Sequence, residues 1–413
     1  MSLTYKQIFE QYSQVEFVRR LYVKRLQQDG TYESDWVEIS QGLMKDESVR
    51  SISRSLPNNS WQLGNVTFNN VRLEILSAFQ DFAGESDPNS VFFGYIRHKS
   101  LIRVVDALVD KYTDPSVPVE AVVTTFEGLL DATTAQTEQG YEKITVLDYL
   151  SILKDVNVSE LTLTQTTLNA LVYEIMNRAI FTKYISVSSS TDYINAGYNT
   201  SSIDVSEYTG SVLDMLQDLA KGHSIFYVDQ DDGYFYFKPA TPTAAVQHSF
   251  LEANNRKLDI SAWRDGVDRQ VTNWYWDKQD IDISAEADPA PVNPISSKFS
   301  SSGVTNATQR QNLLNYILTQ TEDAKPYFKL SLPYFPVIKL LDRVSVQSFG
   351  SAPRDALRWG MFAWTSQETT SPNVAPRWRK PAGIRISSDD EWMVRAISHD
   401  ANLKTTIQLE KIL

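Results

Sequence analysis

Short segments in which apolar and polar residues alternate recur along the chain, and this two-residue period is the feature that most constrains the fold. The first segment is EFVRRLYVKRLQ at residues 16–27, followed by the turn pair Asp29-Gly30 and a second alternating segment at residues 32–39. Alternation places the apolar side chains on one face of a strand, and Asp-Gly is typical of tight hairpin turns. The pattern therefore predicts a β-hairpin near the start of a β-rich fold.

Strand-like segments continue after this hairpin for about a hundred residues. They lie at residues 63–76, 91–96, 101–108, 121–130 and 143–147. Several short strands separated by turn residues are typical of barrels and sandwiches. We predict a first β-barrel domain over residues 14–150, preceded by an N-terminal arm at residues 1–13.

The apolar period becomes helical after residue 150. Residues 163–180 place Leu168, Leu171, Val172, Ile175 and Met176 on one helical face, with threonines ahead of them as N-caps. A second helix is predicted at residues 211–221, where Gly222 takes the position after the C-cap. Between the two helices lies a polar loop at residues 186–209.

The second helix is followed by a hairpin. Residues 224–228 and 234–238 read as strands, and the aspartate-rich turn at residues 229–233 connects them. The segment 151–240 is therefore expected to form a small α+β domain.

Strand character returns in the last part of the chain, at residues 270–276, 327–330, 337–347, 392–397 and 404–413. One helix is predicted inside this region at residues 308–321, after a Pro- and Ser-rich stretch at 288–303 that we expect to be an exposed excursion. We predict a second β-barrel domain from residues 241–275 and 325–413, with a helical insertion at 276–324.

A weak internal repeat relates the two predicted barrels. Leu101-Ile102-Arg103-Val104-Val105 resembles Leu341-Asp342-Arg343-Val344-Ser345. Each is followed by an apolar strand, which ends in Asp131 or Asp400, and then by a closing strand that begins at Lys143 or Lys404. Chance spacing in two unrelated antiparallel domains is the alternative explanation. We interpret the order as two related β-barrels in a fold that is mainly β with α+β insertions.

Composition excludes several classes of protein. The 413 residues contain no cysteine, which excludes disulfides, thiolate metal sites and a cysteine nucleophile. The N-terminus has no secretory signal pattern, and no apolar run is long enough to span a membrane. The net charge of −12 argues against a specific nucleic-acid binder. Such a charge would suit a surface past which DNA slides, but an acidic balance is also the commonest state of a soluble protein, and this ordinary explanation comes first.

No residue pattern predicts a metal or cofactor site. His98, His223, His248 and His399 lack the spacing that brings two imidazoles to one ion. Asp229, Asp231 and Asp232 superficially resemble a calcium loop, but Ala240 stands where a bidentate glutamate should close it. A hairpin turn explains these aspartates, and we expect no cofactor, no metal ligand and no catalytic residue.

The chain contains no nucleophile elbow, dinucleotide fingerprint or phosphate-binding loop, although a pair of carboxylates that meet only in space stays open as an alternative. Two basic clusters stand out from the acidic background. They are Arg97, His98, Lys99 and Arg103, and Arg377, Trp378, Arg379, Lys380 and Arg385. A solvated loop is the simplest explanation of each, with contact to an acidic neighbouring subunit as the functional one.

Taken in order, these parts resemble the baseplate hub proteins of phage tails, which are related to the hub portion of type VI secretion spikes. The resemblance covers nearly the whole chain and rests on the helix at 211–220 with its following hairpin, on Val271-Thr272-Asn273, and on Leu341-Asp342-Arg343-Val344.

This resemblance implies a homotrimer in which two barrels per chain form a pseudo-sixfold ring. Such a ring connects the hexameric tail tube or distal tail protein to tail-tip, spike or fibre proteins, and it lets the tape measure protein and DNA pass. The implied location is the tail tip of a virion assembled in the host cytoplasm. Since the sequence ends at Leu413 directly after its closing strand, an appended enzymatic domain is not expected. A carbohydrate-active enzyme or glycan-binding β protein is the alternative, suggested by 20 Tyr and 9 Trp.

Overall fold

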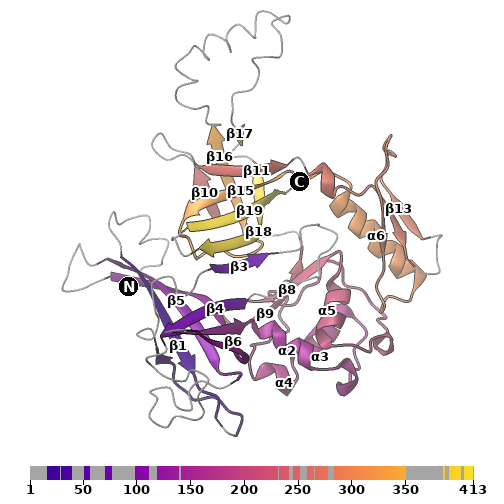
Figure 1. Ribbon diagram of the computed structural model, residues 1–413. Helices are drawn as coiled ribbons and strands as arrows, with labels where there is room; N and C mark the ends of the chain where they lie inside the picture. The colour runs from indigo at the N-terminus through magenta and orange to yellow at the C-terminus, as the bar shows by residue number, and fades with distance from the viewer. Residues whose placement is uncertain are drawn as a thin grey trace, which may run out of the picture.

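The computed structural model shows a chain built mainly of β-strands, in which two large sheets are joined by a smaller helical region (Figure 1). It describes residues 16–27, 29–39, 51–55, 70–76, 98–110, 119–138, 141–230, 232–240, 245–251, 258–264, 266–277, 283–349, 385–386, 390–400 and 404–412. The predicted strand at 91–96 and the first part of the one at 63–76 lie outside these residues.

The first sheet has six strands in the order β2-β1-β5-β6-β7-β4. Its strands are β1 (Glu16–Lys24), β2 (Val37–Glu38), β4 (Asn70–Leu76), β5 (Leu101–Asp110), β6 (Val119–Glu138) and β7 (Tyr141–Leu147). The predicted first hairpin is present, because β1 pairs with β2. At its turn the Asp29 carboxylate accepts the Thr31 N–H at 2.9 Å, and Gly30 has a φ of 81°, which favours glycine.

One face of the first sheet forms a separate apolar core. Alternate residues such as Ile102 and Val104 of β5, and Ile144 and Val146 of β7, are buried there. The two-residue period of the sequence is therefore the period with which this sheet buries its side chains.

The second sheet has eight strands, with the order β10-β16-β18-β19-β15-β11 and two further pairings, of β17 with β16 and of β3 with β18. Its strands are β3 (Ser51–Ser55), β10 (His248–Leu251), β11 (Asp259–Arg264), β15 (Tyr327–Pro333), β16 (Arg343–Phe349), β17 (Arg385–Ile386), β18 (Glu391–Asp400) and β19 (Lys404–Lys411). Its core contains Phe328, Val344, Trp392 and Leu409.

Each of the two large sheets contains four strands that have the same order in the sequence and the same pairing order in the sheet. In the first sheet β5, β6 and β7 form an antiparallel meander, and the earlier strand β4 pairs with β7. In the second sheet β16, β18 and β19 form the meander, and the earlier strand β15 pairs with β19. The sheets differ beyond these four strands, because β1 is antiparallel to β5 whereas β10 is parallel to β16.

The helical region lies between the sheets in sequence. It contains η4 (Tyr149–Ser151), α2 (Ile152–Asp155), η5 (Val158–Glu160), α3 (Leu168–Met176), α4 (Ala179–Thr182), η6 (Val205–Glu207), α5 (Val212–Ala220), β8 (Ser224–Val228) and β9 (Phe235–Pro239). Both predicted helices are present, and the five apolar residues predicted on α3 are all buried. Thr167 is the N-cap of α3, but its side chain makes no capping hydrogen bond.

The short helix α5 has well-defined ends. Ser211 and Asp214 form a capping box at its N-terminus, which satisfies two N–H groups that the helix leaves without partners. Gly222 follows the C-cap with a φ of 80° and lets the chain turn directly into β8. The hairpin β8–β9 is paired over its whole length, from Ser224↔Pro239 to Val228↔Phe235.

A third small sheet packs on the long helix α6 (Ala307–Thr321). It contains β12 (Asn273–Trp276), β13 (Ser284–Glu286) and β14 (Ser296–Phe299), and its core includes Trp274, Phe299 and Leu314. The sequence placed residues 270–276 in the second barrel, and this is wrong: β12 pairs only with β13 and β14 among the described strands. The stretch 288–303 was expected to be an exposed excursion, and most of residues 288–298 are exposed; it also contains the short strand β14.

No helix among the described residues has the length and apolar character that a membrane crossing needs.

His223, at the junction of α5 and β8, gives the helical region a predicted pH dependence. The imidazole is buried, with Nδ1 2.7 Å from the Ser224 hydroxyl, and burial lowers the His223 pKa to about 4. A histidine in the unfolded chain has a pKa of about 6.5. Between pH 6.5 and pH 4 this histidine therefore binds a proton more readily in the unfolded chain than in the folded one. Its contribution to the free energy of unfolding is fully present above pH 6.5 and is lost as the pH falls toward 4.

We predict that the free energy of unfolding falls by roughly 3 kcal/mol, through His223 alone, when the pH is lowered from 6.5 to 4. Urea unfolding at several pH values should show a shallower acid decline in His223→Asn than in the natural protein. His98→Asn is the control, because the His98 side chain is 48% exposed. If His223→Asn loses as much unfolding free energy at low pH as the natural protein does, His223 is not the cause of that loss.

Candidate functional site

The four histidines lie in separate environments. His98 is beside Asp131 at 3.7 Å, His248 Nε2 is 3.3 Å from Asp342, and His399 Nδ1 is 2.9 Å from the Thr405 hydroxyl. Each therefore has a local polar neighbour of its own. Within the described part of the chain, no three His, Asp or Glu side chains gather where they could hold one ion.

The aspartates after β8 hold the hairpin turn and a neighbouring loop. Asp232 accepts the Tyr234 N–H at 2.8 Å and the Tyr236 hydroxyl at 2.5 Å. Both oxygens of Asp229 accept from Lys339 Nζ, at 3.1 and 2.9 Å. Asp231 lies outside the described residues.

The first basic cluster is engaged in ion pairs. Lys99 pairs with Asp155 at 3.2 Å, and Arg103 pairs with Glu127 of β6 at 2.5 Å. Arg97 and the residues from Arg377 to Lys380 lie outside the described residues, and Arg385 is described only as part of β17.

Among the described residues, the structure brings three of the candidates considered from sequence to one place, where the two sheets and the helical region meet. Asp229 and His399 line one small hollow there, and His248 is connected to Asp229 through Asp342 and Lys339.

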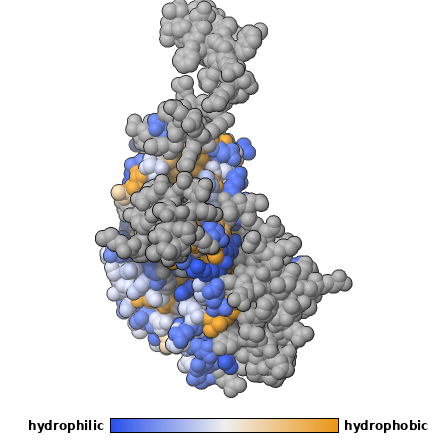
Figure 2. Space-filling view, turned by 90° about the vertical axis from the view of Figure 1, so that its left-hand side faces the viewer, coloured by the Kyte–Doolittle hydropathy of each residue, from blue (hydrophilic) through white to orange (hydrophobic). Residues whose placement is uncertain are grey.

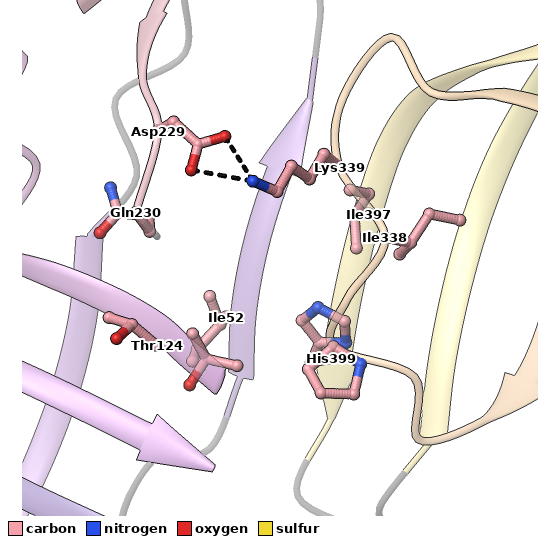
Figure 3. A pocket seen from close by; sticks show the side chains of 10 residues that line it. Ile52, Thr124, Asp229, Gln230, Ile338, Lys339, Ile397 and His399 are labelled. Atoms are coloured by element: carbon pink, nitrogen blue, oxygen red, sulfur yellow. Dashed lines mark hydrogen bonds and ion pairs between the residues drawn. The ribbon is translucent and has the colours of Figure 1, made fainter. Parts of the chain in front are cut away.

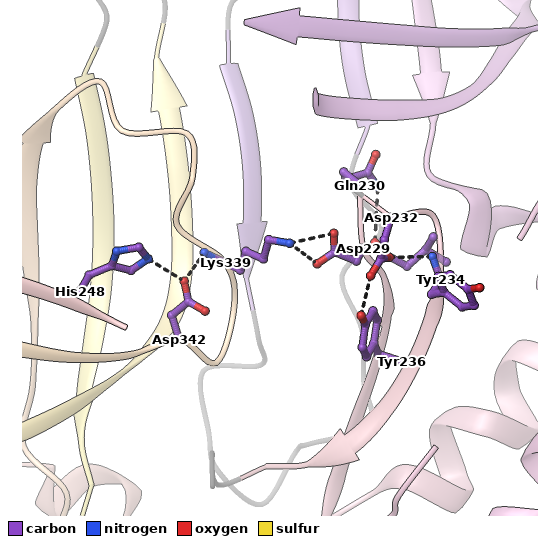
Figure 4. A network of polar contacts seen from close by, with 9 residues as sticks. Asp229, Gln230, Asp232, Tyr234, Tyr236, His248, Lys339 and Asp342 are labelled. Carbon is purple, nitrogen blue, oxygen red and sulfur yellow. Dashed lines mark hydrogen bonds and ion pairs between the residues drawn. The ribbon is translucent and has the colours of Figure 1, made fainter. Parts of the chain in front are cut away.

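The turn after β8 reaches both sheets at this junction (Figure 4). Asp229 binds Lys339, which precedes β16. The side-chain oxygen Oε1 of Gln230 accepts the backbone N–H of Glu127 in β6. The backbone N–H of Lys339 donates to the carboxylate of Asp342 at 2.7 Å, and this holds Lys339 in place. The same carboxylate lies beside His248.

Strand β3 makes a second connection. In sequence it belongs to the first domain, yet it pairs with β18 from Ser51↔Asp400 to Ser55↔Ala396. The side chain of Ile52 is 2% exposed and lies in the core of the first sheet. One strand therefore contributes backbone hydrogen bonds to the second sheet and an apolar side chain to the first.

A buried ion pair makes the third connection. Arg19 of β1 lies directly opposite Asp106 of β5, with Nε 2.7 Å from the carboxylate. The hydroxyl of Tyr334, which follows β15, donates to the same carboxylate, and Arg19 Nη2 donates to that hydroxyl at 2.9 Å. The Asp106 side chain is fully buried and that of Arg19 is 9% exposed. An ion pair that is this deeply buried is stable only when all of its hydrogen-bonding groups have partners, because water cannot replace a missing one.

Two hollows lie at the junction and share Thr124, Asp229 and Gln230. The larger has a volume of about 280 Å³ and opens beside Arg103, Glu127 and Tyr149. The smaller measures about 20 Å³, which is room for about one water molecule, and its lining includes Ile52, Lys339 and His399 (Figure 3). The contacts described above connect the two sheets across these hollows.

Sequence reasoning missed this junction, although part of it left a signal. Arg19 shares its strand face with Leu21 and Val23, and Asp106 shares its face with Ile102 and Val104, all of them buried. A charged residue in the apolar register of a strand predicts a buried partner. Tyr334 and Lys339 lie in a loop, where no comparable signal exists.

The described part of the face seen in Figure 2 is mostly hydrophilic, with small, separated hydrophobic spots.

Comparisons with known proteins place similar structures among phage tail proteins. The fold is similar to a 43 kDa tail protein of prophage MuSo2 from Shewanella oneidensis, with 12% identity, 96% of this chain and 98% of that chain covered, and a TM-score of 0.47. It is similar to prophage tail protein gp18 from Listeria monocytogenes, with 11% identity, coverage of 95% and 94%, and a TM-score of 0.47. A Francisella PdpA–VgrG complex matches at 9% identity and a TM-score of 0.47, with 98% of this chain but 54% of that chain covered. No protein-family model and no curated protein sequence matches.

Proposed function

We propose that the protein is a structural hub of a phage-like tail, in which three chains form a ring with two related β-domains each. The observation that carries the proposal is the shared order of four strands, β4-β5-β6-β7 in one sheet and β15-β16-β18-β19 in the other. Three chains with two such domains each present six similar surfaces, which suits a partner with sixfold symmetry on one side and threefold symmetry on the other.

The residues of the sequence repeat lie at the first strand of each meander. Arg103, the third residue of β5, lies opposite Glu127 and forms an ion pair with it. Arg343, the first residue of β16, lies opposite Met393 and forms its ion pair with Glu391, two positions away. Val104 and Val344, which follow these arginines, are both completely buried. The repeat noted in the sequence therefore falls at the first strand of each meander, β5 and β16, which supports the proposed relation between the domains.

The junction supports a role that depends on rigid geometry. A ring of six similar surfaces requires a fixed angle between the two domains of each chain, since an error at each junction would accumulate around the ring. The shared strand β3, the Arg19–Asp106–Tyr334 group and the Asp229–Lys339 pair would hold that angle.

In this proposal the chain is a virion component of the tail tip, assembled in the host cytoplasm, and its role is not catalytic. Its partners are the tail tube or distal tail protein, the tip, spike or fibre proteins, and the tape measure protein. The net charge of −12 suits a channel through which DNA passes without binding.

The pure protein is predicted to assemble into a homotrimer, with a mass about three times the 46.9 kDa of one chain. Light scattering coupled to size exclusion gives the mass, and averaged electron micrographs should show a ring with a central hole. A monomer that cleaves or binds polysaccharide would overturn the hub proposal in favour of a carbohydrate-active protein.

The junction predicts a graded series of stability changes. Asp106→Asn leaves the buried Arg19 cation without its counter-charge, so it should lower the unfolding free energy by about 3–5 kcal/mol. Tyr334→Phe keeps both charges and removes the hydrogen bond that the hydroxyl donates to Asp106 and the one that it accepts from Arg19 Nη2, so it should cost about 1.5–3 kcal/mol.

Lys298→Ala is the matched control, because the Lys298–Asp277 pair is exposed at 73% and 44% and such pairs contribute less than about 1 kcal/mol. Denaturant unfolding measures all three variants. Equal losses for Asp106→Asn and Lys298→Ala would contradict the structural weight given to the buried pair.

A further inference from the structure

The loop between β13 and β14 exposes an apolar tip. Its sequence from Asp288 to Ile295 is DPAPVNPI, in which only Asp288 and Asn293 are polar. Val292 is 97% exposed and Ile295 is 39% exposed. This concentration of exposed apolar residues on one projecting loop differs from the scattered single residues that need no explanation.

The base of the tip is held firmly. Thr272 donates its N–H to the Ile295 carbonyl at 2.9 Å, and its hydroxyl accepts the Ile295 N–H at 2.8 Å. The N–H of Ala287 donates to the Thr272 carbonyl at 2.9 Å. Three prolines restrict the backbone between these anchors, so little conformational freedom would be lost when the tip binds a partner.

The tip points away from the rest of the chain. Strand β14 begins at Ser296, beside the tip, and ends at Phe299, whose ring lies 5.2 Å from Lys221 Nζ at the end of α5. The tip is therefore at the end of the small sheet remote from the helical region. Figure 1 shows this loop projecting beyond α6 at the edge of the molecule.

A concave surface lies elsewhere on the same chain, where β6 and β7 meet α2. This hollow has a volume of about 350 Å³ and is lined by Leu129, Leu130, Leu147 and Ile152, with His98, Lys99, Asp131, Ser151, Lys154 and Asp155 at its polar side. It is large enough to receive a proline and a valine side chain. Since the tip points away from α5, a chain does not fill its own hollow.

We propose that the Pro291-Val292 tip of one chain docks into this α2 hollow of a neighbouring copy. A convex feature on one surface and a concave one on another make a head-to-tail contact, which closes into a ring when the rotation between copies divides the circle. The inference rests on the proposed ring-forming function and names the surfaces through which adjacent copies meet.

The charges of the two surfaces are compatible with contact between copies. Each copy carries −12, so copies repel one another and contact is easiest where local charge is low. The tip bears one charged residue, Asp288, and the two lysines of the hollow balance its two aspartates. A second copy of this chain is therefore a suitable occupant on both shape and charge.

Disulfide trapping tests the contact directly, because the natural chain has no cysteine. Val292→Cys and Ser151→Cys, each made singly, are mixed and mildly oxidised, and a covalent two-chain product is expected since docking would bring the two sulfurs within bonding distance. Ser189→Cys, an exposed position on another loop, replaces Val292→Cys in the control mixture and should give only background product.

The mass of the same samples separates the possible failures. A trimer in which Val292→Cys and Ser151→Cys couple no better than the control would overturn the docking proposal and leave the hub proposal standing. A monomer without coupling would overturn both. Coupling in an open chain without ring closure would support the docking contact and contradict the ring.

A charge substitution gives an independent measurement on the same surface. Val292→Asp should weaken trimer formation about tenfold or more, since it removes a buried apolar side chain and adds a carboxylate between acidic copies. Ile180→Asp is the matched control, because Ile180 is a 45% exposed aliphatic residue on α4. Equal weakening by both substitutions would contradict a specific role of the tip.

Discussion

The strand β3 is the constraint on which the rest of the structure depends. Its backbone bonds to β18 in the second sheet while Ile52 packs in the core of the first. Neither sheet can rotate relative to the other without breaking backbone hydrogen bonds or exposing a buried side chain, and both changes are costly. The relative orientation of the two sheets is therefore set by the same interactions that stabilise each of them.

The polar contacts at the junction add specificity to this connection. Arg19, Asp106 and Tyr334 satisfy one another only in one arrangement of the two sheets, because a buried charge pair loses most of its value when a partner moves. Asp229 and Lys339 act in the same way from the helical region, although Lys339 is partly exposed and the pair is correspondingly weaker. A protein whose proposed role is to present repeated surfaces at fixed angles benefits from such redundancy.

The sequence predicted the local elements well where one period dominated. The hairpin at Asp29-Gly30, the helices α3, α5 and α6, and the hairpin β8–β9 all follow from apolar spacing and turn or cap residues, which act over a few positions. The placement of residues 270–276 failed for a different reason. A short strand such as β12 shows its own alternation but carries no information about which of several sheets it will join.

By itself, then, the sequence determined the mainly β class and the local hairpins and helices, because these depend on short-range patterns. Arg19 and Asp106 are charges in an apolar register, a signal of a buried partner that was missed from the sequence and that does not identify the partner. Only the tertiary structure decided that Tyr334 completes the group, that β3 joins the second sheet and that Asp229 meets Lys339. These contacts join residues from 110 to more than 300 positions apart in the chain, and the distance between such residues is fixed only when all the cores have packed.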